Sequence, residues 1–465
     1  HFCKLSHRDM LMEPIKPQLP KGMRDFLPAD MIRRQYVMDT IAGVFQLYGY
    51  EPLQTPVMEL KEMLTGKYGD EADKLIYYAQ HAQGKEELAL RYDLTVPLAR
   101  AFAQHESELS LPFKRYQMAP VWRGERPGQG RYREFYQCDA DIVGIAGMEA
   151  DAEGVSVVVT ALQRLGFTDF RVKINNRKVL TGIGQYVGLS GDVLANLYRS
   201  IDKFDKIGAE GVKEDLSKNG IAPDTIGKIA HLLFESPAPE ATGFSADRAR
   251  LGRMREVLGN IPVAQEGLSE LAQLYDFLEA MRTPEVHVEL DFLMVRGLSY
   301  YTGPIFETVL TSNDAEDRVG SVSGGGRYDG LIGLFRRESL PTVGISLGIE
   351  RLIFLMNKWD MYPETLKNTV VQVLVTVFGP ETRHASLKVV STLRAAGINA
   401  ELFMQDARIG KQLGYADRKG IPLVAILGPD EMSRGEVKFK RLADQHETVA
   451  PQSDAARTAS VLLGG

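Results

Sequence analysis

Residues 121–144, VWRGERPGQGRYREFYQCDADIVG, constrain the fold more than any other part of the chain. The two ends of this stretch predict strands, and three glycines and one proline within residues 124–130 predict a hairpin loop between them. Side chains alternate between the faces of a strand, so one face of the second strand carries a cation, an aromatic ring, an amide and two carboxylates: Arg133, Phe135, Gln137, Asp139 and Asp141. We expect this face to form the floor of a polar pocket; an exposed sheet face with mixed charges is the alternative.

The first strand ends at Arg123, at the mouth of the hairpin. A guanidinium forms forked hydrogen bonds with phosphate, and an aromatic face such as that of Phe135 can stack on a flat base. The pair therefore indicates an anionic ligand with a flat base. This stretch resembles motif 2 of the class II aminoacyl-tRNA synthetases, the hairpin that binds ATP.

The composition bounds the class of protein. A chain of 465 residues predicts about three domains, and 44% hydrophobic residues are enough for a large core. The net charge of −6 gives no global signal for nucleic-acid binding, so any tRNA contact must come from local basic patches. Two cysteines, Cys3 and Cys138, argue against a disulfide framework and suit a reducing compartment. The eight histidines include no pair at metal-ligand spacing, which predicts no protein-only metal site.

Targeting and membrane signals are also weak. No apolar run reaches membrane-spanning length, and residues 1–16 read as a disordered lead-in rather than a secretory signal. We therefore expect a cytoplasmic protein without membrane contact.

Residues 30–48 have helical spacing, with Asp30 expected as the N-cap. A strand is expected over residues 51–59, with Pro56 inside it, which implies an edge or interface position. The unit resembles motif 1 of class II synthetases, which forms their dimer interface. From these residues alone, an ordinary helix–strand unit is an equal alternative.

The string LRYDLTVP, residues 90–97, places Asp93 and Thr95 in a turn before a helix that opens near Pro97. Either residue alone has an ordinary explanation as a helix cap. The string resembles the histidyl-tRNA synthetases, in which the corresponding acid and threonine hold the ammonium group of the amino acid.

Residues 148–166 predict a helix, and residues 178–284 predict an inserted helical module without a catalytic cluster. Strands return from residue 286, and Arg296 lies at a break just before Tyr300 and Tyr301. The glycines of VSGGGRYDGL, residues 322–331, permit a close backbone approach to a ligand, or form a flexible hairpin. No glycine-rich stretch makes a P-loop.

TVGISLGIERL, residues 342–352, predicts a strand that turns at Gly348 into a helix carrying Arg351. It resembles motif 3 of class II synthetases, whose arginine meets the far phosphate of ATP. After a linker over residues 357–368, strands and helices alternate to the end of the chain, which predicts a small α/β domain with a mostly parallel sheet. No GxGxxG follows any of these strands, which disfavours a dinucleotide-binding fold.

Two strings narrow the resemblance to one family. VRGLSYYTG, residues 295–303, and SGGGRYDGL, residues 323–331, closely resemble strings of the histidyl-tRNA synthetases. Ser299 stands where that family usually has aspartate, which puts in doubt only the local contact of that acid.

The resemblance runs from residue 17 to the C-terminus and implies an α+β fold. It implies an antiparallel-sheet catalytic domain over residues 17–177 and 285–357, a helical insertion over residues 178–284 and an anticodon-binding α/β domain over residues 369–465.

The resemblance also implies the activity: histidine is activated by ATP, bound with Mg²⁺, and transferred to tRNA(His) by a homodimer. It assigns the ammonium group to Asp93, Thr95 and Gln137, and the imidazole to Asp141 with Tyr300 and Tyr301. It assigns ATP to Arg123, Glu125, Phe135 and Arg351, and the chemistry at the α-phosphate to Arg123 and Arg296. It assigns tRNA contacts to Arg126 and Gln129 at the hairpin tip. Lys411, Gln412 and Tyr415 on a C-terminal helix are further candidates for tRNA contact, with a solvated helix face as the alternative.

Three competing interpretations remain: a non-catalytic regulatory paralogue, a synthetase for another amino acid and an ATP-dependent ligase that does not use tRNA. Such paralogues lack the C-terminal domain and usually lose the RGLxYY string, whereas this chain has both. The two histidine-type strings argue against the second, and the C-terminal α/β domain disfavours the third.

Overall fold

The computed structural model describes residues 15–67, 73–128, 130–235, 243–295, 300–311 and 319–464. Most of the expected lead-in lies outside the described residues, as do three residues singled out from the sequence: Gln129, Arg296 and Ser299. The chain divides into two compact units, described separately below. The larger comprises residues 1–24 and 37–361, and the smaller comprises residues 25–36 and 362–465.

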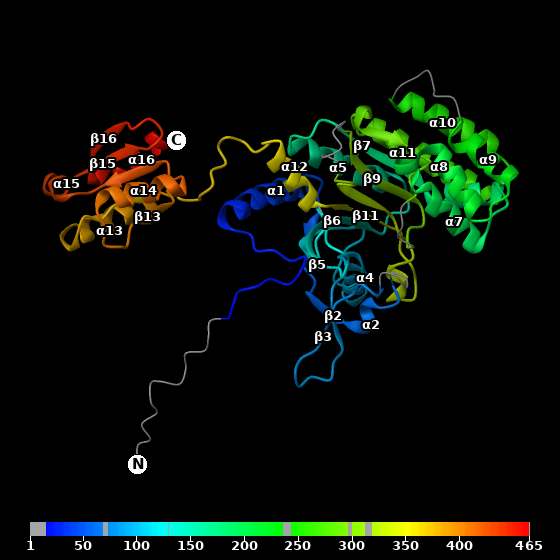
Figure 1. Ribbon diagram of the computed structural model, residues 1–465, viewed down its shortest axis with the longest axis horizontal. Helices are drawn as coiled ribbons and strands as arrows, with labels where there is room; N and C mark the ends of the chain where they lie inside the picture. Colours follow the sequence, from blue (N-terminus) through cyan, green and yellow to red (C-terminus); the bar gives the residue numbers. More distant parts are fainter. Residues whose placement is uncertain are drawn as a thin grey trace, which may run out of the picture. The chain divides into compact units, whose positions relative to one another are not determined.

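An eight-stranded sheet forms the centre of the larger unit (Figure 1). Its edge strands β1 and β8 run parallel to their neighbours, whereas all other neighbouring strands are antiparallel. The large antiparallel sheet confirms the expected α+β class. In spatial order the strands are β1 (Glu51–Pro52), β5 (Phe113–Trp122), β6 (Glu134–Val143), β11 (Thr342–Leu347), β10 (Ser323–Arg327), β9 (Pro304–Leu310), β7 (Phe170–Asn176) and β8 (Val288–Leu290).

The predicted hairpin is β5 and β6, which pair over their full length from Phe113↔Val143 to Trp122↔Glu134. On the other side of β6 lies β11, which turns at Gly348 into α12 (Ile349–Lys358), as predicted. The glycine run forms β10, which is buried along its whole length, so a strand replaces the flexible hairpin considered from the sequence. Helix α5 (Glu149–Arg164) packs on β11 and β10 through its buried apolar stripe.

The expected strand over residues 51–59 is wrong, because the structure has two short strands in two sheets. β1 joins the main sheet, and β2 (Met58–Leu60) joins a three-stranded antiparallel sheet with β4 (Leu88–Leu90) and β3 (Tyr78–Ala79). Pro52 and Pro56 lack the N–H that continuous pairing needs, so the intervening segment leaves both sheets. Its carbonyls at Thr55 and Pro56 accept hydrogen bonds from the buried Arg91 side chain.

Helix α1 (Pro28–Leu47) begins two residues earlier than expected, so Asp30 lies in its first turn rather than at the N-cap. A carboxylate in the first turn still interacts favourably with the helix dipole. Two more helices of the larger unit flank the three-stranded sheet: α2 (Lys61–Leu64) and α4 (Thr95–Gln104).

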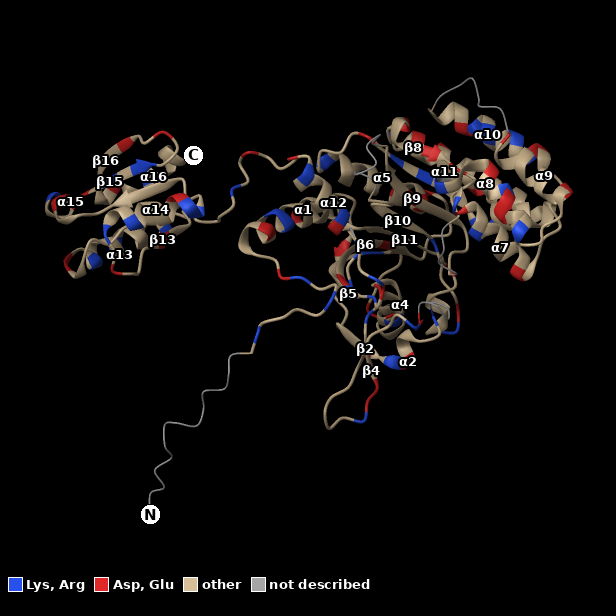
Figure 2. Ribbon diagram, viewed as in Figure 1, with Lys and Arg blue, Asp and Glu red and all other residues tan. Residues whose placement is uncertain are grey.

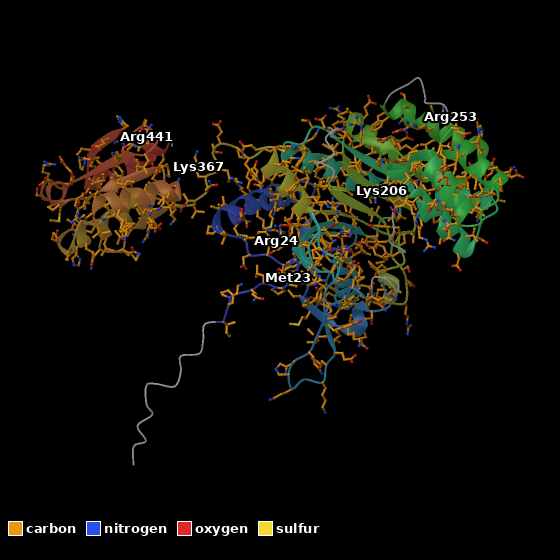
Figure 3. All side chains as sticks on the ribbon, in the orientation of Figure 1. Met23, Arg24, Lys206, Arg253, Lys367 and Arg441 are labelled. Atoms are coloured by element: carbon orange, nitrogen blue, oxygen red, sulfur yellow. The ribbon has the colours of Figure 1, made fainter. Side chains whose placement is uncertain are left out.

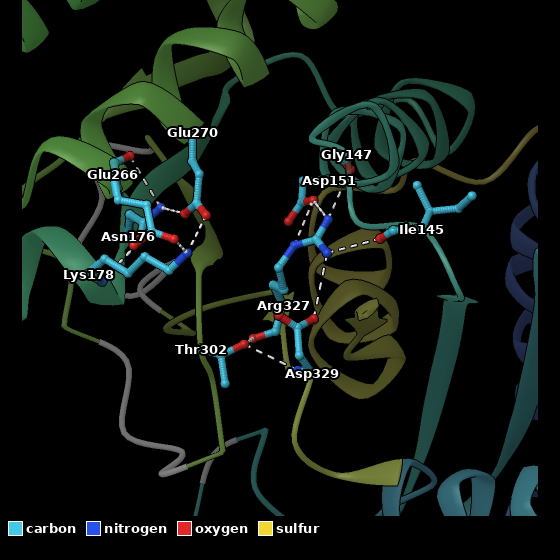
Figure 4. Close-up of polar contacts among 11 residues, drawn as sticks. Ile145, Gly147, Asp151, Asn176, Lys178, Glu266, Glu270, Thr302, Arg327 and Asp329 are labelled. Carbon is cyan, nitrogen blue, oxygen red and sulfur yellow. Dashed lines mark hydrogen bonds and ion pairs between the residues drawn. The ribbon is translucent and has the colours of Figure 1, made fainter. Parts of the chain in front are cut away.

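Six helices form the predicted insertion, which lies beside the β7 and β9 end of the sheet (Figure 1). Asn176 caps its first helix by accepting from Lys178 N and donates to Glu270 on its last helix at 2.7 Å (Figure 4). Lys178 also pairs with Glu266 and Glu270 of that last helix, so the first and last helices of the insertion are joined. The helices are α6 (Arg177–Tyr186), α7 (Gly191–Ile201), α8 (Phe204–Lys218), α9 (Pro223–Leu233), α10 (Gly243–Val257) and α11 (Pro262–Ala280).

The smaller unit contains a five-stranded sheet in the order β13-β12-β14-β15-β16. The first three strands are parallel, as predicted, but the last two are antiparallel, so the sheet is mixed. β16 and the helices α15 and α16 were not predicted; β16 buries only Ala450, which leaves a weak pattern. The elements are β12 (Val373–Val375), α13 (Pro380–Ala395), β13 (Ala400–Leu402), α14 (Ile409–Lys419), β14 (Leu423–Ile426), α15 (Pro429–Arg434), β15 (Glu436–Arg441), β16 (Glu447–Pro451) and α16 (Ala455–Leu463).

Lys and Arg alternate with Asp and Glu along the ribbons of both units (Figure 2), which agrees with the absence of a global charge signal in the sequence. Within the described part of the chain, no helix has the length and apolar character needed to cross a membrane.

A buried ion pair between Arg327 and Asp151 fastens the end of β10 to the first turn of α5 (Figure 4). The guanidinium also donates to the carbonyl oxygens of Ile145 and Gly147, each at 3.0 Å. Both side chains are almost fully buried, at 3% and 0% exposure. The arginine of the glycine-rich string therefore holds the sheet against its covering helix.

We predict that Asp151→Ala lowers the free energy of unfolding of the larger unit by about 3–5 kcal/mol, because it leaves the Arg327 guanidinium buried without its carboxylate. Urea denaturation measures the change. Glu108→Gln is the control, since it breaks an exposed pair with His105 and should cost less than about 1 kcal/mol. Equal effects of the two substitutions would contradict the prediction.

Candidate active site

A cavity of about 460 Å³ lies in the larger unit and is lined by β6, β11, β10 and the loops around them. All the residues that were predicted from the sequence to bind histidine or ATP, and that are described, line it: Asp93, Thr95, Arg123, Glu125, Phe135, Gln137, Asp141, Tyr300, Tyr301 and Arg351. The structure therefore brings together side chains that are far apart in the sequence, up to the 258 positions between Asp93 and Arg351.

Asp141 belongs to β6 and lies on the cavity floor, with β5 on one side and β11 on the other. It faces Arg115 of β5 and Gly344 of β11 in the strand register, and its carboxylate forms an ion pair with Arg115 at 2.7 Å. The Tyr328 hydroxyl donates to its other oxygen. Burial raises the pKa of Asp141, and Arg115 and then Tyr328 oppose that rise.

Gly344 makes room for this carboxylate. A Cβ at that position would lie 2.0 Å from Asp141 Oδ1 and 3.1 Å from a ring carbon of Tyr328. Only glycine therefore leaves Asp141 in its observed place.

Asp93 is both a helix cap and a cavity residue. Its Oδ1 accepts from the backbone N–H of Thr95 at 3.2 Å and of Val96 at 3.1 Å, at the start of α4. The capping interpretation is thus confirmed, and it leaves the carboxylate in the cavity wall. The cap fixes the position of this carboxylate.

Gln137 extends from the same face of β6. Its Nε2 donates to the Ser346 hydroxyl at 3.2 Å, while its Oε1 is buried without a hydrogen-bond partner among the described residues. An acceptor oxygen with an unused lone pair in a cavity wall suits a cationic donor such as an ammonium group.

Arg123 lies where the loop leaves β5. Its Nε donates to the Tyr92 carbonyl at 3.2 Å, and its guanidinium carbon lies 4.5 Å from the Tyr92 ring centre and 5.1 Å from that of Phe135. The two rings and the carbonyl fix the plane of the fork, as binding of a phosphate requires.

Two further charged residues line the same part of the cavity. Arg351, in the first turn of α12, donates to the Ser321 carbonyl. Glu125 pairs with Arg131 at 3.3 Å across the loop.

The N-terminal segment contributes a contact that the sequence analysis missed. Arg24 (Figure 3) pairs with Glu350 at 2.5 Å and lies 3.2 Å over the Tyr132 ring, and Gly22 accepts from the Arg133 backbone N–H at 2.9 Å. The segment thereby joins the hairpin to the start of α12. No pattern in this proline-broken stretch signalled it.

Asp139 was expected on the pocket face without a role, and Arg115, Ser346 and Glu350 were not predicted. Asp139, Ser346 and Glu350 line the cavity, and Arg115 lies beneath it as the partner of Asp141. Strand alternation was the available signal for Asp139.

The residues expected to contact tRNA differ in how far their side chains are exposed. Arg126 and Lys411 are exposed. Tyr415 is half-buried and donates to Glu401 at 2.7 Å. Gln412 is fully buried, with hydrogen bonds to the Val377 N–H, the Val377 carbonyl and the Ala407 carbonyl. The expectation for Gln412 is therefore corrected: its amide links α14 to the end of β12.

Comparisons with known proteins agree over both units. The model of the histidyl-tRNA synthetase family matches residues 22–352, and the model of the anticodon-binding domain matches residues 372–458. The chain is 42% identical to the histidine–tRNA ligase of Cytophaga hutchinsonii, over 92% of this chain and 96% of the relative. It is 40% identical to the ligase of Bacteroides fragilis, over 92% and 95%.

A crystal structure of histidyl-tRNA synthetase from Nostoc superposes with a TM-score of 0.83 at 32% identity, covering 96% of this chain and all of that one. With a matched fold, a matched order of motifs and relatives that align over nearly their whole length, the chain belongs to the histidyl-tRNA synthetase family.

Proposed function

We propose that the cavity activates L-histidine with ATP to form histidyl-adenylate, and that the protein then transfers the histidyl group to tRNA(His). One observation carries the proposal: a single cavity is lined by two carboxylates, Asp93 and Asp141, and by two arginines held by backbone carbonyls, Arg123 and Arg351. We call the first set the acidic end and the second set the cationic end. An amino acid that presents an ammonium group and an imidazole fits the first end, and a triphosphate fits the second.

At the acidic end, we assign the α-ammonium group to Asp93, Thr95 and Gln137. We assign the imidazole to Asp141, with Tyr300 and Tyr301 beside it. Arg115 keeps Asp141 oriented, and Tyr328 occupies one of its oxygens. A ligand that lacks these donors would leave buried acceptors unpaired, which is a strong basis for rejecting it.

At the cationic end, the reaction is an in-line attack of the histidine carboxylate on the α-phosphorus of ATP. Negative charge builds up on the phosphoryl oxygens while two anions approach, and fixed cations stabilise that state. We assign Arg123 to the α-phosphate and Arg351 to the far phosphate, with Phe135 stacked on adenine and Glu125 near the nucleotide. Arg296, outside the described residues, completes the assignment at the reacting carboxylate.

Mg²⁺ is proposed to arrive with ATP. A magnesium ion in such a site is held by substrate phosphates and one or two carboxylates, and Glu125 and Glu307 line the cavity. These oxygen donors fit the ion, which would neutralise charge on the phosphates when bound.

The smaller unit is proposed to bind the anticodon part of the tRNA, with Lys411 and Tyr415 as candidate contacts on α14. Arg126, with Gln129 outside the described residues, is proposed to meet the acceptor end.

We further propose that the protein acts in the cytoplasm as a homodimer. Exposed apolar side chains on and beside the three-stranded sheet support this assembly, because a second copy would bury them: Val57, Met58, Leu60 and Tyr78.

We predict that pyrophosphate exchange, assayed with each standard amino acid in turn, proceeds with histidine only. The reason is the pair of buried acceptor groups at the acidic end, which only a ligand with both cationic and imidazole donors satisfies. Exchange with a second amino acid at the rate seen with histidine would overturn the proposal.

We predict that Gly344→Ala raises the KM for histidine about tenfold or more and leaves the KM for ATP within about twofold. The new methyl displaces Asp141, and a lost charge-assisted hydrogen bond is worth about 1.5–3 kcal/mol. Gly227→Ala in α9 is the matched control, since nothing lies within 4 Å of its added methyl. An unchanged KM for histidine in Gly344→Ala would remove Asp141 from the assignment.

We predict that Arg123→Lys lowers the rate of pyrophosphate exchange by about two orders of magnitude, because an ammonium group lacks the planar fork that the two rings hold. Arg126→Lys, on the same loop but exposed, should exchange normally. If both variants exchange at the wild-type rate, Arg123 does not bind the reacting phosphate.

A further inference from the structure

Asp139 is a carboxylate of the cavity wall to which the assignments above give no role. It lies on β6 between Gln117 of β5 and Ser346 of β11, one alternation before Asp141. Its residue is 3% exposed, it lines the cavity, and its Oδ1 has no hydrogen-bond partner among the described residues. A buried acceptor that faces a cavity without a partner indicates a ligand that supplies one.

The surroundings of Asp139 are acidic. Asp141 follows on the same strand, and Asp93 lies in the turn before α4. The opposing cation is Arg115 of β5, which already pairs with Asp141 at 2.7 Å and donates to the Leu94 carbonyl. The other group that favours the ionised form is the Ser346 hydroxyl of β11, which lies opposite Asp139 in the strand register and lowers its pKa. Tyr300 lines the same cavity, and burial raises the pKa of its hydroxyl well above the ordinary value, so it stays neutral.

Asp139 is a second buried carboxylate beside Asp141, which is already paired with a cation. Such a group is stable in two protonation states. It keeps a proton, or it ionises when a cation arrives. Burial, followed by the charges of Asp141 and Asp93, raises the pKa of Asp139 to about 7, against the lowering effects of Arg115 and Ser346. In the protein without ligand, part of the Asp139 population therefore keeps its proton at neutral pH.

We propose that Asp139 is a specificity-determining residue that gives up its proton when the amino acid binds, so that its carboxylate receives the substrate's α-ammonium group together with Asp93 and Gln137. The O–H bond of the carboxyl breaks, the proton goes to solvent, and a carboxylate–ammonium pair forms in its place. This inference rests on the proposed function, because it takes L-histidine as the ligand of the acidic end.

Histidine binding is expected to depend on pH. The pKa of Asp139 is raised in the free protein and lowered in the complex, so binding releases protons and tightens as the pH rises through about 7. The proton release from this group therefore decreases as the pH rises above about 7.

Calorimetric titration of the full chain with L-histidine, in buffers of different ionisation enthalpy, counts the protons released. Asp139→Asn is the test variant, because it keeps the size of the side chain and cannot ionise. The histidine imidazole titrates in the same range and contributes equally to both proteins. The expected result is that wild type releases a fraction of a proton more than Asp139→Asn at pH 7, and that this difference decreases as the pH rises.

Two further measurements separate recognition from structure. Imidazolepropionate lacks the ammonium group, so it should release no more protons from wild type than from Asp139→Asn. Ser346→Ala removes a hydroxyl that lowers the pKa of Asp139, so it should increase the proton release at pH 7. Asp139→Asn should also raise the KM for histidine while leaving the KM for ATP unchanged.

Equal proton release by wild type and Asp139→Asn, with histidine bound to both, would overturn the inference and leave the proposed function intact. Absence of any histidine binding or histidine-dependent exchange by wild type would instead overturn the proposed function. If imidazolepropionate released the same excess of protons from wild type over Asp139→Asn as histidine does, Asp139 would not recognise the ammonium group.

Discussion

The buried ion pair between Arg115 and Asp141 is the contact on which the acidic end of the cavity depends. Arg115 is fully buried, pairs with Asp141 at 2.7 Å and donates to the carbonyl of Leu94. One guanidinium thus joins β5, β6 and the turn that carries Asp93. Breaking a buried pair leaves an uncompensated charge and typically costs about 3–5 kcal/mol, so the stability of the sheet and the shape of the pocket rest on the same group.

The sequence predicted the hairpin, the strand-to-helix turn at Gly348, the helical insertion and most of the cavity wall. These predictions succeeded because the alternation of side chains along a strand and the breaks caused by glycine or proline are local signals. Arg115 was not predicted, since the buried face of β5 carries Arg115 and Gln117, whereas the less buried face carries Tyr116 and Met118. A search for apolar residues would assign the wrong face of this strand to the core. Its polar residues face inward only where a carboxylate lies opposite them in the sheet.

Long-range contacts account for the other omissions. Glu350 meets Arg24 from 326 positions away, and Arg327 meets Asp151 from 176 positions away. Neither pairing has a local signature. Gln412 shows the converse error: a polar residue on a predicted helix suggested a surface, but its amide is buried and bonds to backbone groups of the segment after β12 and of the loop before α14. Side-chain polarity alone does not distinguish these two situations.

Asp139 and Asp141 show how one strand can give the same residue type two behaviours. They lie two positions apart on one face of β6, and both are buried. Asp141 has an arginine across the strand and a tyrosine hydroxyl on its other oxygen, so it is a fixed acceptor. Asp139 faces Gln117 and Ser346 at the corresponding positions, and neither can carry a compensating charge. A cationic ligand would therefore favour its ionisation, whereas a ligand without a cationic group would leave its buried oxygen without a partner.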